Sequence, residues 1–150
     1  MKQIIFILPL LFLSCGGDDL DIANTPLTGT IEGESWSYEN GNGYLFSSDL
    51  KYRIRLLSTE ENVDDPCTSP RPNKPHVSFI VSPVIGSYSL PLPNLQESAQ
   101  FHVNTATSSF ATSGFLEIFD VSNNRMIGYI QAQLDEQNTV EGNFEAVLCN

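Results

Sequence analysis

The apolar residues of this chain recur in short runs, and this pattern restricts the possible folds more than any other feature. From residue 27 onward, runs of four to nine residues rich in Val, Ile, Thr, Tyr and Phe alternate with Gly, Asn, Pro and Ser, and no 3.6-residue apolar period persists. Such runs are typical of β-strands. We therefore expect an all-β domain with one helical turn near residues 95–98, and with strands near residues 27–33, 35–39, 44–48, 51–58, 76–82, 86–90, 100–105, 114–121, 126–134 and 139–149.

Polar segments between these runs predict tight turns. Asn40-Gly41-Asn42-Gly43 can adopt the positive φ of a hairpin turn, and residues 122–124 and 135–138 have a similar turn-forming composition. Tight turns make neighbouring strands antiparallel. About 8 to 10 strands at this spacing indicate a single antiparallel β-sandwich or β-barrel.

The last run is the clearest strand. Every second residue from position 140 to 148 is apolar or Gly, and Glu141, Asn143 and Glu145 lie between them. We therefore expect one face of this strand to be buried. That face is formed by Val140, Gly142, Phe144, Ala146 and Leu148. The stretches Thr30–Gly33 and Thr139–Gly142 are similar to each other. We expect them to mark the first and last strands and to lie near each other.

The first fifteen residues have the pattern of a secretory signal. Lys2 precedes an apolar run of ten residues from Ile4 to Leu13, and small residues follow. Ten residues rise only about 15 Å as a helix, which is half the thickness of the hydrocarbon core, so a permanent span is disfavoured. The stretch Leu11–Cys15 resembles a bacterial lipobox, in which the Cys thiol is acylated and becomes the first residue of the mature protein. Cys15 is therefore the expected lipidation site, for example with palmitate among its chains.

The residues after Cys15 suggest where the anchored protein lies. Residues 16–21, Gly-Gly-Asp-Asp-Leu-Asp, resemble the acidic tail that directs many lipoproteins to the outer face of the outer membrane; the alternatives are a solvated tether and the periplasmic face. We divide the chain into a signal peptide (1–14), an acidic flexible tether (15–26) and the all-β domain (27–150).

The cysteine count is consistent with export. Once Cys15 is acylated, Cys67 and Cys149 are the one possible pair, and an oxidising compartment would let them form a disulfide. The alternatives are two free thiols or part of a metal site, but the chain has no Cys-x-x-Cys and no third thiolate for zinc.

The net charge excludes one class of partner. Seven Lys and Arg against eighteen Asp and Glu give a formal charge of −11, which would repel nucleic-acid phosphates. The same charge suits cations or basic partners, although acidic surfaces are common in proteins that have neither.

Motifs for catalysis or for a bound cofactor do not emerge. His76 and His102 lie on different predicted strands without the neighbours that a metal needs, and no Ser lies in a Gly-x-Ser-x-Gly elbow. The chain also has no Gly-rich phosphate loop before a helix. We expect no enzymatic activity, no cofactor and no metal.

Two loop features leave alternatives open. The acids at 60–61 and 64–65 favour a solvated loop, with a Ca²⁺ site or a glycosidase pair as alternatives. The segment Ser58–Pro75 that contains them is longer than a hairpin loop and is rich in Pro. It is either a tolerated surface excursion or a pinned binding loop.

A basic stripe is the main candidate for ligand binding. Lys51, Arg53 and Arg55 alternate with apolar residues and so project from one strand face. They either pair with acidic neighbours and protect a sheet edge, or bind an anionic ligand or partner.

The leader, the acidic tether, the Gly-x-x-Trp from Gly33 to Trp36 and the closing hairpin together resemble the small uncharacterised surface lipoproteins of Bacteroidota. The resemblance implies an outer-membrane-anchored binding or interaction module with an unknown protein or glycan partner. One alternative is a glycan-binding accessory protein of a surface uptake system, which would need a platform of exposed aromatic residues. Trp36, Tyr38, Tyr44 and Tyr129 are the candidates, although such residues more often pack in the core or between strands. The other is a lipocalin-like carrier of a small apolar ligand, which needs an unfilled barrel.

Overall fold

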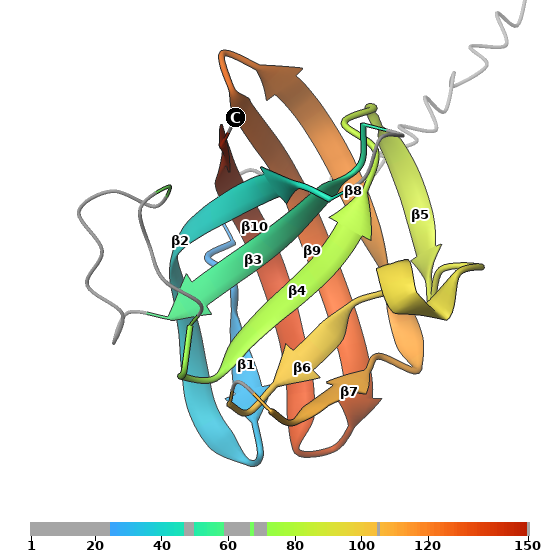
Figure 1. The fold of residues 1–150 in the computed structure, drawn as a ribbon. Coiled ribbons are helices and arrows are strands. Elements are labelled where there is room, and N and C mark those ends of the chain that lie inside the picture. The colour runs from blue at the N-terminus through green and yellow to red at the C-terminus, as the bar shows by residue number, and fades with distance from the viewer. Residues whose placement is uncertain (1–24, 47–49, 59–66, 68–71, 105, 150) are drawn as a thin grey trace, which may run out of the picture.

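The structure is a computed structural model that describes residues 25–46, 50–58, 67, 72–104 and 106–149. Ten strands form one sheet in the order β5-β8-β9-β10-β1-β2-β3-β4-β6-β7, and neighbours in this order are antiparallel. The sheet curls into a half-barrel (Figure 1), so the expected all-β antiparallel fold is confirmed. The strands are β1 (Thr28–Ile31), β2 (Glu34–Leu45), β3 (Tyr52–Ser58), β4 (His76–Val81), β5 (Gly86–Leu90), β6 (Gln100–His102), β7 (Ser108–Phe110), β8 (Ser113–Ser122), β9 (Arg125–Asp135) and β10 (Asn138–Cys149), with a 3₁₀ turn η2 (Leu95–Glu97) between β5 and β6.

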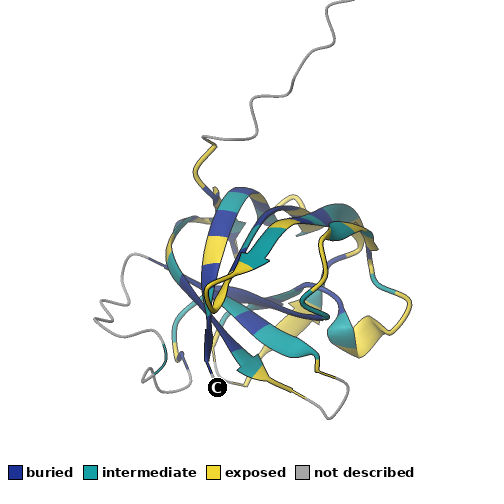
Figure 2. Ribbon diagram, turned by 90° about the horizontal axis from the view of Figure 1, so that it is seen from above, coloured by how far each residue is buried: buried dark blue, intermediate teal, exposed yellow. Residues whose placement is uncertain are grey.

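The core fills the inner face of the curled sheet. Phe79 of β4 meets Phe144 of β10 edge to face, with ring centroids 5.6 Å apart, so the two arms of the sheet pack against each other. The alternation predicted for the last strand is confirmed, because its apolar set is buried while Glu141 and Glu145 are exposed. Figure 2 shows buried and exposed positions succeeding one another along the strands.

The predicted hairpin at residues 40–43 is wrong, because these residues lie inside the single long strand β2. Gly41 and Gly43 are needed there for close packing and not for a turn. A Cβ on Gly41 would lie 2.9 Å from the Glu145 carbonyl oxygen, and one on Gly43 would lie 2.6 Å from Ile54 Cδ1. The glycines therefore let β2 pass close to β10 and β3, a role that local sequence does not distinguish from a turn.

The other two predicted turns are confirmed, and so is the expectation that the first and last strands of the chain lie near each other. Asn123 and Asn124 both have positive φ between β8 and β9, and residues 136–137 form the turn before β10. The similar stretches near Thr30 and Thr139 belong to β1 and β10, which pair so that these two threonines face each other. Strand β7 was not predicted, because Ser108–Phe110 is a short and mostly polar run.

The disulfide between Cys67 and Cys149 is present, with Cα atoms 5.6 Å apart across a sequence separation of 82. It ties the segment after β3 to the end of the last strand. The leader, residues 15–24 of the tether and the acids at 60–61 and 64–65 lie outside the described residues. The last two tether residues, Thr25 and Pro26, already contact Asn143 of β10. No helix in the described part of the chain has the length and apolar character of a membrane span.

Reduction of this disulfide should destabilise the protein. A cross-link that closes a loop of this length restricts the unfolded chain, and its loss typically costs about 2 to 4 kcal/mol. We expect the urea midpoint of the purified domain to fall when reductant is added. A C67S/C149S variant should have the same urea midpoint as the reduced protein, and reductant should not change it. Equal midpoints of the native chain with and without reductant would contradict a stabilising role for the disulfide.

Candidate functional site

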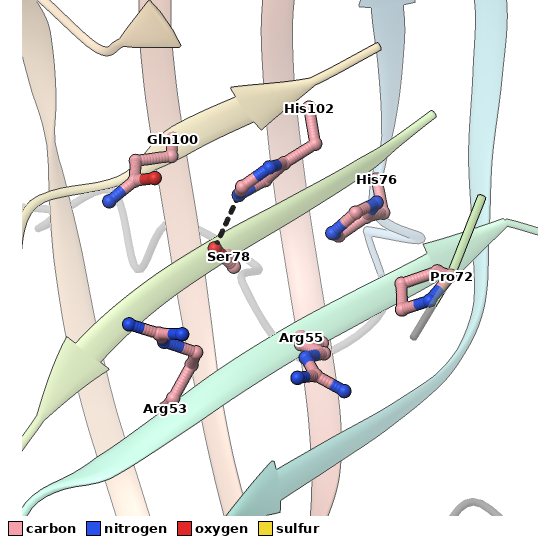
Figure 3. Close-up of a pocket in the computed structure, with 7 residues that line it drawn as sticks. All are labelled: Arg53, Arg55, Pro72, His76, Ser78, Gln100 and His102. Atoms are coloured by element: carbon pink, nitrogen blue, oxygen red, sulfur yellow. Dashed lines mark hydrogen bonds between the residues drawn. The ribbon is translucent and has the colours of Figure 1, made fainter. Parts of the chain in front are cut away.

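The basic stripe divides into two parts in the structure. Strand β3 lies between β2 and β4, so its arginines do not protect a sheet edge. Lys51, just before β3, places its Nζ 2.8 Å from both carboxylate oxygens of Glu97 in η2. This contact lowers the pKa of the Glu97 carboxyl. Lys51 thus pairs with an acid. Arg53 and Arg55 line a pocket on the outer face of the sheet (Figure 3).

The pocket has a volume of about 200 Å³ and is shared by three adjacent strands. Strand β3 contributes the two guanidinium groups, and β4 and β6 contribute imidazole, hydroxyl and amide groups. Figure 3 shows these side chains converging on one region. The lining residues are Arg53, Arg55, Pro72, His76, Ser78, Gln100 and His102.

Two histidines that are far apart in the sequence meet at this pocket. His76 of β4 and His102 of β6 are direct register partners. Their rings stack with centroids 4.3 Å apart and planes 3° from parallel. The Nε2 atom of His102 lies 2.8 Å from the Ser78 hydroxyl oxygen. Sequence reasoning missed this cluster because it considered each histidine on its own strand, and only the pairing of β4 with β6 brings them together.

Two aromatic rings, one near the end of β2 and one just after it, contact the guanidinium groups. The Arg53 guanidinium lies 4.5 Å from the centroid of the Phe46 ring, and that of Arg55 lies 5.1 Å from the Tyr44 centroid. Such cation–π contacts favour a charged group over the ring face. The Tyr44 hydroxyl donates a hydrogen bond of 3.0 Å to the Cys67 carbonyl, and Tyr44 is the register partner of Cys149. The disulfide therefore supports the ring on which Arg55 lies.

Burial keeps the histidine pair neutral. The pKa of His76 is lowered to about 4, mainly by burial; its Nδ1–H donates to the Lys74 carbonyl at 2.9 Å, which opposes the shift, and the charges of His102 and Arg55 add to it. The pKa of His102 is also lowered, by burial and then by Arg53 and Arg55. At neutral pH the positive charge of the pocket thus lies on its arginines.

These groups suit an anion better than a cation. Guanidinium, hydroxyl and amide groups can all donate hydrogen bonds, and the two fixed positive charges oppose a metal ion. Within the described ranges, three or more His, Cys, Asp or Glu side chains do not gather at any point where a metal could be held.

Of the four aromatic residues considered for a glycan platform, two are buried, and Tyr38 and Tyr44 are half-buried. Trp36 is only 5% exposed, because it lies on the inward face of β2, and its Nε1–H donates to the Pro75 carbonyl at 3.0 Å. Tyr129 is 8% exposed, and its hydroxyl donates to Glu141 at 2.5 Å. Tyr38 is half-buried and donates to the Glu145 carbonyl. The expectation that Trp36 is an exposed binding residue is therefore wrong.

The neutral histidine pair makes stability depend on pH. Because the folded state lowers the pKa of His76 from 6.5 to about 4, the unfolded chain binds more protons, and stability is lost as the pH falls between these values. Between pH 7 and pH 4.5 the native protein should lose about 2 to 3 kcal/mol more of its free energy of unfolding than H76Q. Urea unfolding at the two pH values measures this difference. An equal loss in both proteins would show that the carboxylates alone set the acid sensitivity.

Comparison with known proteins adds no relative to this description. No known protein family, curated protein or solved structure matches the chain. The chemistry of the pocket is therefore the basis on which a class of ligand can be assigned.

Proposed function

We propose that the protein is a lipoprotein anchored in the outer membrane, at the cell surface or on the periplasmic face, that binds an anionic ligand in the outer-face pocket. The observation that carries this proposal is the placement of Arg53 and Arg55 beside the His76–His102 pair in one pocket. We propose a binding role and not a catalytic one. The residues that line the pocket support the choice of an anionic ligand, and the lipobox-like leader supports the lipid anchor.

The distribution of charge supports an anionic ligand. The chain has only seven Lys and Arg against eighteen Asp and Glu, yet two of the seven line this pocket. Arg presents several N–H donors in a planar fork, which matches carboxylate, sulfate and phosphate groups. In a strongly acidic protein, such a local positive region favours a specific anion over general attraction of anions to the surface.

The two alternatives have less support from the described residues. A lipocalin-like carrier needs an open interior, but the inner face is filled by side chains such as Phe79, Leu116 and Ile130, which are almost fully buried. A glycan-binding role through an aromatic platform needs exposed rings, and Trp36 and Tyr129 are not exposed. An acidic glycan remains within the proposed ligand class through its carboxylate or sulfate groups.

The pocket arginines should control anion binding. A hydrogen bond to a charged group contributes about 1.5 to 3 kcal/mol, so R53Q and R55Q should each weaken sulfate binding at pH 7 by about tenfold or more. Isothermal titration calorimetry at constant ionic strength measures this. R125Q is the matched control, because Arg125 lies on β9, pairs with Glu145 at 2.8 Å and carries the same charge. Equal weakening by R125Q would reduce the effect to net charge and would contradict the proposed site.

The anchor has a separate test. Protein extracted from native membranes should have the mass of an acylated chain that begins at Cys15, and a C15S variant should leave the membrane fraction. Protease added to intact cells should cleave the protein if it is displayed at the surface, whereas protection would place it on the periplasmic face. A mature chain that begins elsewhere and lacks a lipid would refute the anchor.

A further inference from the structure

Hydrogen-bonding groups from three adjacent strands line the pocket. Two guanidinium groups lie on one side, on β3, and the imidazoles, the Ser78 hydroxyl and the Gln100 amide lie across from them on β4 and β6 (Figure 3). A planar carboxylate is satisfied by one guanidinium fork, whereas a tetrahedral oxyanion directs its oxygens toward several donors at once. A water occupies about 30 Å³. The pocket, at about 200 Å³, therefore has room for such a group together with part of the molecule that bears it.

The stacked histidines can accept one proton between them but not two. With ring centroids 4.3 Å apart, two imidazolium groups would repel each other strongly, so the pair titrates as a unit. His76 Nδ1–H already donates to the Lys74 carbonyl, which leaves its Nε2 as the atom that would take a proton. On His102, Nε2 contacts the Ser78 hydroxyl, and this hydroxyl can donate to the neutral ring or accept from a charged one.

Positive charge next to the pair opposes its protonation. Arg53 and Arg55 face the pair from β3, and Lys74 precedes His76 on the same segment. On the side of β6, the register partner of His102 is the neutral Ser108 of β7. Glu97 in η2 is held by Lys51. An anion between the arginines and the imidazoles would offset the positive charge of the guanidinium groups and so favour a proton on the pair.

We propose that the pocket binds a tetrahedral oxyanion, the sulfate or phosphate group of a larger ligand, together with one proton taken up by the His76–His102 pair. This inference rests on the proposed function and adds that pH regulates the binding of the anion. Because binding and protonation are linked, each strengthens the other by the same factor. The protein therefore holds its ligand more tightly in an acidic medium and releases it as the pH rises.

Sulfate is the appropriate probe, since its own charge does not change between pH 5 and pH 8. We expect its affinity for the native domain to rise as the pH falls, by at most about tenfold for each pH unit in which the bound pair is protonated and the free pair is not. The chain has only two histidines, so their ring C–H signals can be followed by NMR and assigned with the variants. At pH 6, added sulfate should move both signals toward the positions of the charged ring.

Variants of the two histidines test the proton uptake separately from the binding of the anion. In H76Q and in H102Q, each of which keeps one imidazole, the ratio of the affinities at pH 5 and pH 8 should fall, and in the double variant H76Q/H102Q it should fall to one. R125Q should keep the native ratio. Circular dichroism and the fluorescence of Trp36, which is the one Trp of the chain, check that each variant is folded. If H76Q does not fold, H102Q and the NMR shifts of the native protein test the same point.

The outcomes distinguish this inference from the function on which it rests. Sulfate binding that depends on Arg53 and Arg55 but is equal at pH 5 and pH 8 would overturn the proton uptake and leave the anion site intact. Absence of arginine-dependent binding at either pH would overturn both. Acetate bound as tightly as sulfate would overturn the tetrahedral assignment, and parallel titrations with sulfate and phosphate at pH 8 identify which of the two groups the pocket prefers.

Discussion

The curvature of the sheet depends on the place where β2 and β10 come together. Strand β1 has only four residues, and it separates β2 from β10 along part of their length. Beyond it, Gly41 to Tyr44 of β2 pair directly with Ala146 to Cys149 of β10, in parallel. The chain that enters β1 passes so close to Gly142, at φ 141°, that a Cβ there would lie 2.4 Å from the Leu27 Cα. A side chain at this point would push the entering chain away from β10.

The candidate site is a consequence of this closure. Parallel pairing of β2 with β10 sets Cys149 opposite Tyr44, and the disulfide then brings the Cys67 carbonyl within hydrogen-bonding distance of the Tyr44 hydroxyl. The ring so fixed lies beneath the Arg55 guanidinium. A covalent link at the end of the last strand thus helps to position a charged group in the middle of the outer face, where β3, β4 and β6 meet.

The two faces of the sheet have different physical roles. The inner face holds the apolar core and contributes most of the stability, because apolar burial is the main favourable term in folding. On the outer face, β4 is also buried along its whole length, but there its side chains include His76 and Ser78. Burial of imidazoles beside two arginines disfavours their charged form, which opposes folding at low pH and leaves groups that an anion can engage. Stability and the proposed binding therefore depend on the same residues.

The sequence by itself determined much of the fold, because many strands and turns depend on local residue patterns. The inward and outward alternation of β10, the turn at Asn123-Asn124 and the limits of β5 follow from residue periodicity and backbone preference within a few positions. The Cys67–Cys149 pair followed from counting. Only the tertiary structure decided that residues 40–43 continue a strand, and that His76 and His102 face each other across β4 and β6. The physical reason is that strand pairing and register depend on how distant strands pack around the core, so side chains from separate runs form one site only when the sheet assembles.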